Sequence, residues 1–337
     1  MTRKRVWLVV AGSAMLGLLG VWLGIRSSSS DPDERPPADL SPAGPGTGGR
    51  SGPRPEVAAL IAEANEVCDR LVKRFPHAPE SHDVKGWALF RFGNSSEAVK
   101  SWRKCVELDS TFGSAYYWMG RCAFDREDYA LAADSFRKAL ELEPGSAVYP
   151  LYLANALMRL AQFEEAVAVL QRDLKARPAA MPSYVLLGQA HLHLRQYQEA
   201  KQSLEKAIAI APDYTSAYYT LATACDRLGE KEKAKEYHAR FRRLKERDHR
   251  EERESLKRYD DTAEVRQGVA RVYALAARVY DAHGEAAEAE SHRRRAAELE
   301  PTSPQGPAPQ GPAREAGSEA WVLPGLEALP APEPARR

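Results

Sequence analysis

The stretch that decides the fold runs from Met181 to Tyr214 and reads MPSYVLLGQAHLHLRQYQEAKQSLEKAIAIAPDY. Its small and proline residues recur at one spacing along the chain (132 − 98 = 34). One series comprises Ala98, Ala132, Ala166, Ala200 and Ala234. A second comprises Gly86, Gly120, Ala154, Gly188 and Ala222, and a third comprises Pro144, Pro178 and Pro212. A period of this length is typical of a solenoid built from helix–turn–helix repeats.

Packing explains the three series. The small residues mark the point where the two helices of a repeat cross, because a larger side chain there would hold the helices apart. Glycine costs a helix roughly 1 kcal/mol relative to alanine, so the close approach must contribute more than that. The prolines end the second helix, since proline has no N–H to donate and clashes with the preceding turn. One repeat cannot bury its apolar face alone, so the repeats must stack.

The repeats resemble the tetratricopeptide repeat family. The resemblance rests on an aromatic residue, two spacers, an apolar residue and a small one, as in Tyr116-x-x-Met119-Gly120, Tyr184-x-x-Leu187-Gly188 and Tyr218-x-x-Leu221-Ala222. It covers roughly residues 55–300 and implies an all-α fold, a right-handed α-solenoid of helix–turn–helix repeats. It implies little about chemistry, because function belongs to sites placed on folds.

The phase of the period predicts the domain organisation. We expect a capping helix over 55–76, five repeats over 79–246, a charged helical insertion over 247–269 and a final repeat over 270–300. The five repeats start near Pro79, Gly113, Ala147, Met181 and Thr215, and the last starts near Ala270. No glycine or proline occurs from residue 230 to residue 265, which predicts a long charged helix that continues the fifth repeat. Because contacts in a solenoid are local, a fragment over 55–260 should stay folded.

The N-terminal residues predict a membrane anchor. Three basic residues at positions 3 to 5 precede Val6–Ile25, an uncharged apolar run long enough to span a bilayer. A cleaved signal peptide is the alternative, but Arg26 and four serines follow instead of a small-x-small site. We therefore expect one transmembrane helix, with residues 1–5 in the cytoplasm and the repeats on the periplasmic or other extracytoplasmic side.

Two segments are too rich in Pro, Gly and other small or polar residues to bury a core, and we expect them to be disordered: a linker over 26–54 and a tail over 301–337. Within the tail, Trp321, Leu323, Leu326 and Leu329 form an apolar island. It could act as a short docking motif or fold back on the last helix. Isolated exposed apolar residues are common, so docking is the less favoured interpretation.

The composition argues against several functions. A net charge of +1 with 28% charged residues shows no bulk basic bias, so nucleic-acid binding is not expected. The sequence holds no His-Glu-x-x-His or Gly-x-Ser-x-Gly motif. We therefore expect no enzyme activity, cofactor, metal or small-molecule substrate. The four cysteines, none in a Cys-x-x-Cys pair, should be small buried residues, with a Cys105–Cys122 disulfide as the alternative in an oxidising compartment.

In this family the first helices line a concave groove, which the resemblance implies is the binding site for a protein or peptide. The residues that follow the crossing residue form its central line: Trp87, Arg121, Asn155, Gln189 and Thr223. Residues four positions away share the same helix face and form a charged flank and a mainly apolar flank. The predicted site comprises Trp87, Tyr117, Trp118, Arg121, Tyr152, Asn155, Arg159, Gln189, His193, Tyr219 and Thr223.

The chain departs from one specificity of the family. Members that bind chaperone tails use a clamp of lysines, arginine and asparagines, whereas the matching positions here hold Asp83, Trp87, Trp118, Val148 and Tyr152. We therefore expect a membrane-tethered interaction scaffold, similar to bacterial tetratricopeptide proteins of exported-protein biogenesis or envelope complex assembly. A cytosol-facing organelle import receptor and a non-catalytic subunit of an enzyme complex are the alternatives.

Overall fold

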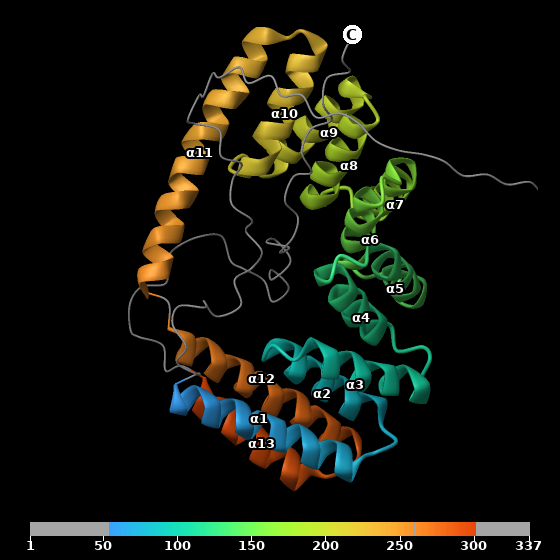
Figure 1. Cartoon of the computed structure of the whole chain (residues 1–337), viewed down its shortest axis with the longest axis vertical. Helices are drawn as coiled ribbons and strands as arrows, with labels where there is room; N and C mark the ends of the chain where they lie inside the picture. The colour runs from blue at the N-terminus through green and yellow to red at the C-terminus, as the bar shows by residue number, and fades with distance from the viewer. Residues whose placement is uncertain (1–53, 259, 301–337) are drawn as a thin grey trace, which may run out of the picture. The chain divides into compact units, whose positions relative to one another are not determined.

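The computed structural model describes residues 54–258 and 260–300, which form thirteen α-helices and no strand (Figure 1). The helices are α1 (Pro55–Arg74), α2 (Pro79–Arg91), α3 (Ser95–Leu108), α4 (Gly113–Asp125), α5 (Tyr129–Leu142), α6 (Tyr149–Arg159), α7 (Phe163–Ala176), α8 (Met181–His193), α9 (Tyr197–Ile210), α10 (Thr215–Leu228), α11 (Lys231–Arg258), α12 (Asp261–Ala282) and α13 (Ala286–Leu299). The predicted anchor over Val6–Ile25, nearly all of the linker and the tail lie outside the described residues. Within the described ranges, no helix is both long and apolar enough to cross a membrane.

Five helical hairpins follow the predicted phase. Their first helices are α2, α4, α6, α8 and α10, and four of these begin at the residue where the period places a repeat start. The exception is α6, which begins at Tyr149 rather than at Ala147. Helices α5, α7 and α9 each end two residues before the proline of their repeat, as expected from the missing N–H of proline.

The glycines lie at the helix crossings, as predicted. A methyl group on Gly86 would lie 2.7 Å from the indole of Trp102, and one on Gly120 would lie 2.8 Å from the ring of Phe136. At Gly188 the distance to Leu204 Cγ would be 2.5 Å. Each second helix therefore inserts a large side chain where the first helix has none. This contact fixes how closely the two helices of a repeat approach.

The turns between the paired helices share one backbone feature. One residue in each turn is left-handed, with φ between +58° and +86°, and these residues are Gly93, Glu127, Ala161, Arg195 and Gly229. They are spaced by the same period as the crossings (127 − 93 = 34). Three of the five are not glycine and adopt a conformation that L-residues disfavour. The turn geometry therefore repeats even where the residue type does not.

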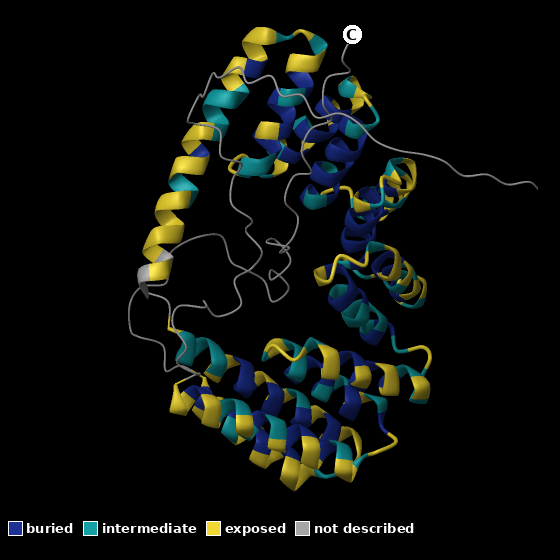
Figure 2. Cartoon of the chain, in the orientation of Figure 1, coloured by how far each residue is buried: buried dark blue, intermediate teal, exposed yellow. Residues whose placement is uncertain are grey.

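Helix α11 confirms the predicted long charged helix. It has 28 residues, the most of any described helix, and its second half is largely exposed (Figure 2). The next helix begins earlier than predicted: α12 starts at Asp261, not near Ala270. The Asp260 carboxylate accepts a hydrogen bond from the Thr262 N–H at 2.9 Å and so caps this helix. Part of the predicted insertion therefore belongs to the last hairpin.

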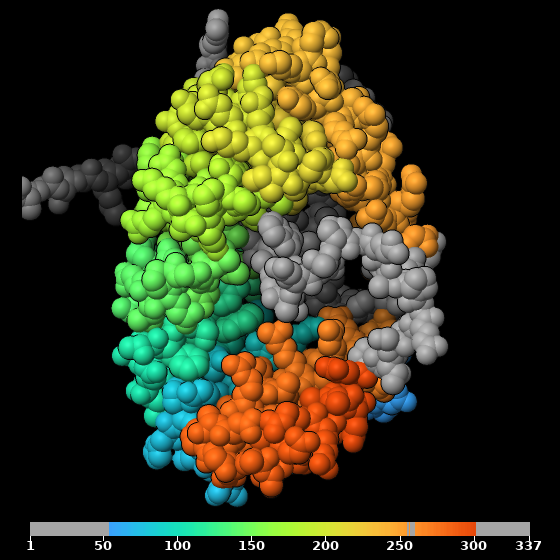
Figure 3. Space-filling view, turned by 180° about the vertical axis from the view of Figure 1, so that it is seen from behind, coloured from blue at the N-terminus to red at the C-terminus, as the bar shows by residue number. Residues whose placement is uncertain are grey.

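The last hairpin packs against the beginning of the described chain. Val67 and Leu71 of α1 share an apolar cluster with Val269, Val272 and Ala276 of α12, and α12 also packs on α2. Figure 3 shows α12 and α13, in orange to red, beside the helices coloured blue. The sequence predicts α1 to be a second helix that lacks its first helix. In the structure α12, from the other end of the described chain, packs against it.

Polar contacts also stabilise the interface between α1 and the last hairpin. The Glu63 carboxylate of α1 accepts hydrogen bonds from Arg295 Nε at 2.8 Å, from a second Arg295 nitrogen at 3.1 Å and from the Tyr273 hydroxyl at 2.8 Å. The Arg295 hydrogen bond is the main reason why the pKa of Glu63 lies below its usual value. Arg74 pairs with Glu285 at 2.6 Å. The contacts of the last hairpin are thus not local, contrary to the expectation for the whole solenoid.

Candidate partner-binding face

The predicted central line is not a row of exposed polar groups. Trp87 is 9% exposed, and the Arg271 guanidinium of α12 lies 5.0 Å from the centre of its ring. Asn155 and Gln189 are only 3% and 4% exposed. The reason is that α6 and α8 carry apolar side chains on nearly every face and are buried along most of their length (Figure 2). The exposure expected of these three residues is therefore absent from the structure.

Other predicted residues retain surface. Arg159 is exposed, and its guanidinium lies 5.7 Å from the centre of the Tyr129 ring. His193 stacks on Phe163 with 4.7 Å between the rings, and burial lowers its pKa. Tyr219 is 39% exposed. Thr223, partly exposed, donates its hydroxyl hydrogen to the Tyr219 carbonyl of its own helix at 3.0 Å.

Arg121 lies at the centre of the polar groups that the structure brings together. It donates from one terminal nitrogen to the Tyr152 hydroxyl at 2.6 Å and, more weakly, to the Tyr117 hydroxyl at 3.4 Å. Its guanidinium carbon lies 4.6 Å from the centre of the Tyr152 ring. The Arg121 Nε is buried without a hydrogen-bond partner. All three residues belong to the predicted site, and α4 and α6 bring them into contact.

Aromatic rings surround this group. The Tyr117 ring lies 5.0 Å from the rings of both Trp118 and Tyr149 and 5.4 Å from that of Tyr152. We call Arg121, Tyr117, Tyr152, Trp118 and Tyr149 the Arg121 cluster. Sequence analysis missed Tyr149, although it stands three residues before Tyr152 and so shares its helix face. Aromatic rings beside a cation provide both apolar contact area and cation–π attraction.

Helix α2, which precedes this cluster in the sequence, carries a partly buried carboxylate. Asp83 accepts a hydrogen bond from the Trp102 indole N–H at 2.9 Å. Burial raises the pKa of Asp83 to about 6, although the hydrogen bond from Trp102 opposes this shift. Trp102 in turn stacks on Trp118 with 5.9 Å between the rings. Asp83 stands at one position where members of the family that bind chaperone tails have a basic or amide side chain. An acidic side chain at that position does not attract a carboxylate.

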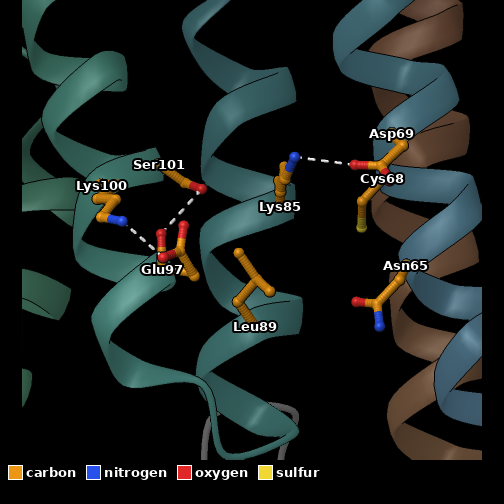
Figure 4. Close-up of a pocket in the computed structure, with 8 residues that line it drawn as sticks. All are labelled: Asn65, Cys68, Asp69, Lys85, Leu89, Glu97, Lys100 and Ser101. Atoms are coloured by element: carbon orange, nitrogen blue, oxygen red, sulfur yellow. Dashed lines mark hydrogen bonds and ion pairs between the residues drawn. The ribbon is translucent and has the colours of Figure 1, made fainter.

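A separate polar pocket of about 400 Å³ lies among α1, α2 and α3 (Figure 4). Its charges are already paired, Lys85 with Asp69 at 2.8 Å and Lys100 with Glu97 at 2.6 Å. Cys68 also lines it, but burial raises the pKa of its thiol to about 12, so the reactive thiolate is not formed near neutral pH. The pocket offers neither an activated nucleophile nor an unpaired charge.

The cysteines are free and buried in the described chain. The alternative of a Cys105–Cys122 disulfide is therefore not the state of this structure. Burial raises the pKa of the Cys122 thiol to about 11. Among residues 54–258 and 260–300, no group of three or more His, Cys, Asp or Glu side chains could hold a metal ion.

Comparison with known proteins identifies the repeats. Family models described as tetratricopeptide repeat match residues 84–147, 123–190 and 191–243. Residues 84–243 therefore carry tetratricopeptide repeats. The matched ranges include α3 to α10 and end before the α12–α13 hairpin.

Curated relatives match over short stretches. The chain is 31% identical to Hsp70-Hsp90 organizing protein 2 of Arabidopsis thaliana over 75 residues, which are 22% of this chain and 13% of that protein. It is 27% identical to small glutamine-rich tetratricopeptide repeat-containing protein 2 of Mycosarcoma maydis over 98 residues, 29% of this chain and 28% of that protein. The chain thus spans less than a third of the length of these relatives.

Among solved structures, YrrB, described as a TPR protein with an unusual peptide-binding site, matches with a TM-score of 0.48 and 21% identity over 52% of this chain and 91% of that chain. The structure described as pilF of Pseudomonas aeruginosa matches with a TM-score of 0.43 and 19% identity over 72% of this chain and 95% of that chain.

Proposed function

We propose that this chain is a membrane-tethered scaffold that binds a segment of a partner protein on the face of its first helices. The observation that carries the binding is the Arg121 cluster. It combines a guanidinium with phenol groups and an indole, and it lies on α4 and α6 within the repeats. Aromatic and arginine side chains are the residue types that dominate protein-binding hot spots. Tetratricopeptide repeats are typically non-catalytic, which favours a scaffold over an enzyme.

The kind of partner and the tethering to a membrane are both proposed here. Two matched relatives are named for organising Hsp70 and Hsp90. The clamp positions here differ, and Asp83 would repel a partner's terminal carboxylate, so we do not extend that partner to this chain. Tethering rests on the apolar run Val6–Ile25, and a role in exported-protein biogenesis or envelope complex assembly rests on that layout. N-terminal sequencing of the purified protein tests the anchor, since a start beyond Arg26 would show that the run is cleaved.

The binding face is tested by removing its two arginines that still have surface. In the full-length chain, Arg121→Ala with Arg159→Ala should weaken partner capture under mild cross-linking by about tenfold or more, since 1.4 kcal/mol corresponds to tenfold. Asn155, buried as it is, is a poor choice for this test. The matched control is Arg250→Ala with Arg253→Ala on the exposed part of α11. Should the control lose the partner while the Arg121 variant keeps it, the binding surface is α11 and the proposal is wrong.

A further inference from the structure

The Arg121 cluster has more hydrogen-bond donors than acceptors. A guanidinium offers five N–H donors and each phenol one O–H. The contacts of Arg121 in the described structure reach two phenol oxygens, and its Nε has no partner. No ion pair joins Arg121 to a carboxylate within the described ranges. Asp125, one turn along α4, is exposed and attracts Arg121 only from a distance.

The chemistry that would complete this cluster is a carboxylate. A partly buried cation without a counter-ion is costly, and a carboxylate would both neutralise it and accept hydrogen bonds from the terminal N–H groups that the two phenols do not use. The rings of Tyr117 and Trp118 lie beside it, keep part of their surface and would pack against an apolar or aromatic side chain next to that carboxylate. The cluster therefore suits a segment in which an acidic residue stands near a large apolar one.

The chain itself contains such a segment. Residues 315–333 hold four glutamates and no lysine or arginine, and they enclose the apolar island around Trp321. Glu319 stands two residues before Trp321. Trp321 stands 21 positions after Glu300, the last described residue, which is a reach of about 70 Å for an extended chain. Leu299 at the end of α13 belongs to the apolar cluster against which Trp118 packs, so the tail starts from a helix of that same cluster.

We infer that the C-terminal segment 315–333 binds to the Arg121 cluster of its own chain, with the Glu319 carboxylate paired to Arg121 and the Trp321 ring against the partly exposed Tyr117 and Trp118. This inference rests on the proposed function, because it makes the tail a competitor of the partner on the same face. A tethered segment experiences an effective concentration of about millimolar when its linker spans the distance. A segment that binds weakly as a free peptide therefore suffices to occupy the face until a tighter partner displaces it.

The test uses the full-length chain and a fluorescently labelled synthetic peptide of residues 313–333. The tail variant Glu319→Gln with Trp321→Ser should bind this peptide at least tenfold more tightly than the wild type does, because its own tail no longer competes. Adding Arg121→Ala to the tail variant should weaken peptide binding at least tenfold without changing the helical circular dichroism. Adding Arg253→Ala instead should leave binding unchanged, and a peptide with the two tail substitutions should not bind.

Three results would overturn the inference. In the first, the tail variant fails to bind the peptide. In the second, it binds the peptide equally well after Arg121→Ala. In the third, the apparent Kd of the wild type for the peptide rises with total protein concentration, which would show that a second copy supplies the tail. Partner capture is measured in parallel to separate the two proposals. If partner capture is lost in Arg121→Ala but the tail variant does not bind the peptide, only the tail inference is refuted. If peptide binding requires Arg121 but partner capture is unchanged in Arg121→Ala, only the proposed function is refuted.

Discussion

The repeats from α4 to α9 and the group formed by α1, α2, α12 and α13 differ in how far apart their contacting residues stand. In the repeats, Arg121 binds Tyr152, 31 residues away, and Arg137 binds Glu165, 28 residues away. In the group, Arg295 binds Glu63, 232 residues away. The first region is a stack in which each helix packs on its sequence neighbours. The second joins the two ends of the described chain.

This difference has a thermodynamic meaning. The cost of closing a flexible loop grows only slowly with its length, by about 0.6 kcal/mol for each doubling. A long-range interface can therefore be as stable as a local one once enough apolar surface is buried. It nevertheless makes α1 depend on residues that follow α11, whereas the repeats of the stack depend only on adjacent repeats.

The largest expected effect comes from removing the last hairpin. A chain that ends at residue 260 loses the side chains of Val269, Val272 and Tyr273, which are buried in the apolar cluster shared with α1. Each fully buried apolar side chain contributes about 1.5–3 kcal/mol, so α1 and α2 should lose their stable packing. We expect a lower helical signal in circular dichroism and fast amide exchange confined to residues 55–91. A fragment with unchanged exchange there would mean that the hairpin contributes little.

An effect of medium size is expected when a glycine at a helix contact is replaced by alanine, and it should differ between the two regions. Gly188→Ala places a methyl group 2.5 Å from Leu204 Cγ and should destabilise the stack by about 1–3 kcal/mol. Gly268→Ala on α12 places its methyl group 3.3 Å from the Phe92 ring, and alanine favours the helix by about 1 kcal/mol, so the net change should be close to zero. Urea denaturation of both variants measures the two free energies. If both variants lose the same free energy of unfolding, the space beside the glycine does not set the stability of the two contacts.

A smaller effect should follow pH. The Arg295 hydrogen bond lowers the pKa of Glu63 in the folded state, so the stability that this contact supplies is complete above the usual carboxyl pKa of about 4.3 and is lost as the pH falls through the lowered value. Arg295→Ala should cost about 1 kcal/mol at pH 7, and this cost should shrink in more acidic buffer. Thermal melts at several pH values measure it. The exposed pair Arg137–Glu165 of the stack is the control, and Glu165→Gln should lower the free energy of unfolding by only about 0.3 kcal/mol.

The smallest effect concerns the turns of the stack. Glu127 and Arg195 have φ of +62° and +59°, which glycine adopts without strain. Each substitution by glycine should stabilise the chain by up to about 1 kcal/mol, while Gly284→Ala in the last hairpin, at φ +78°, should destabilise it by a similar amount. Melting temperatures of the three variants decide this. A loss of stability in Glu127→Gly would show that its side chain contributes more than the turn strain costs.

The sequence by itself determined the features that repeat with the period: the helix starts at Pro79 and Met181, the crossing at Gly188 and the long α11 helix. These features are local, since a glycine or a proline acts within a turn or two of its own position. The period also placed Arg121, Tyr117 and Tyr152 on related helix faces, which is why the predicted site includes them.

Only the tertiary structure decided what packs over those faces. The phase gives the direction of a side chain from its helix, but burial depends on neighbours from other helices. Trp87 has the groove position that the period assigns, yet Arg271 of α12 covers it, and Asn155 and Gln189 are enclosed by packed helices. The pairing of Glu63 with Arg295 likewise has no sequence signature, because two charged residues 232 positions apart are brought together by the apolar contact of α1 with α12.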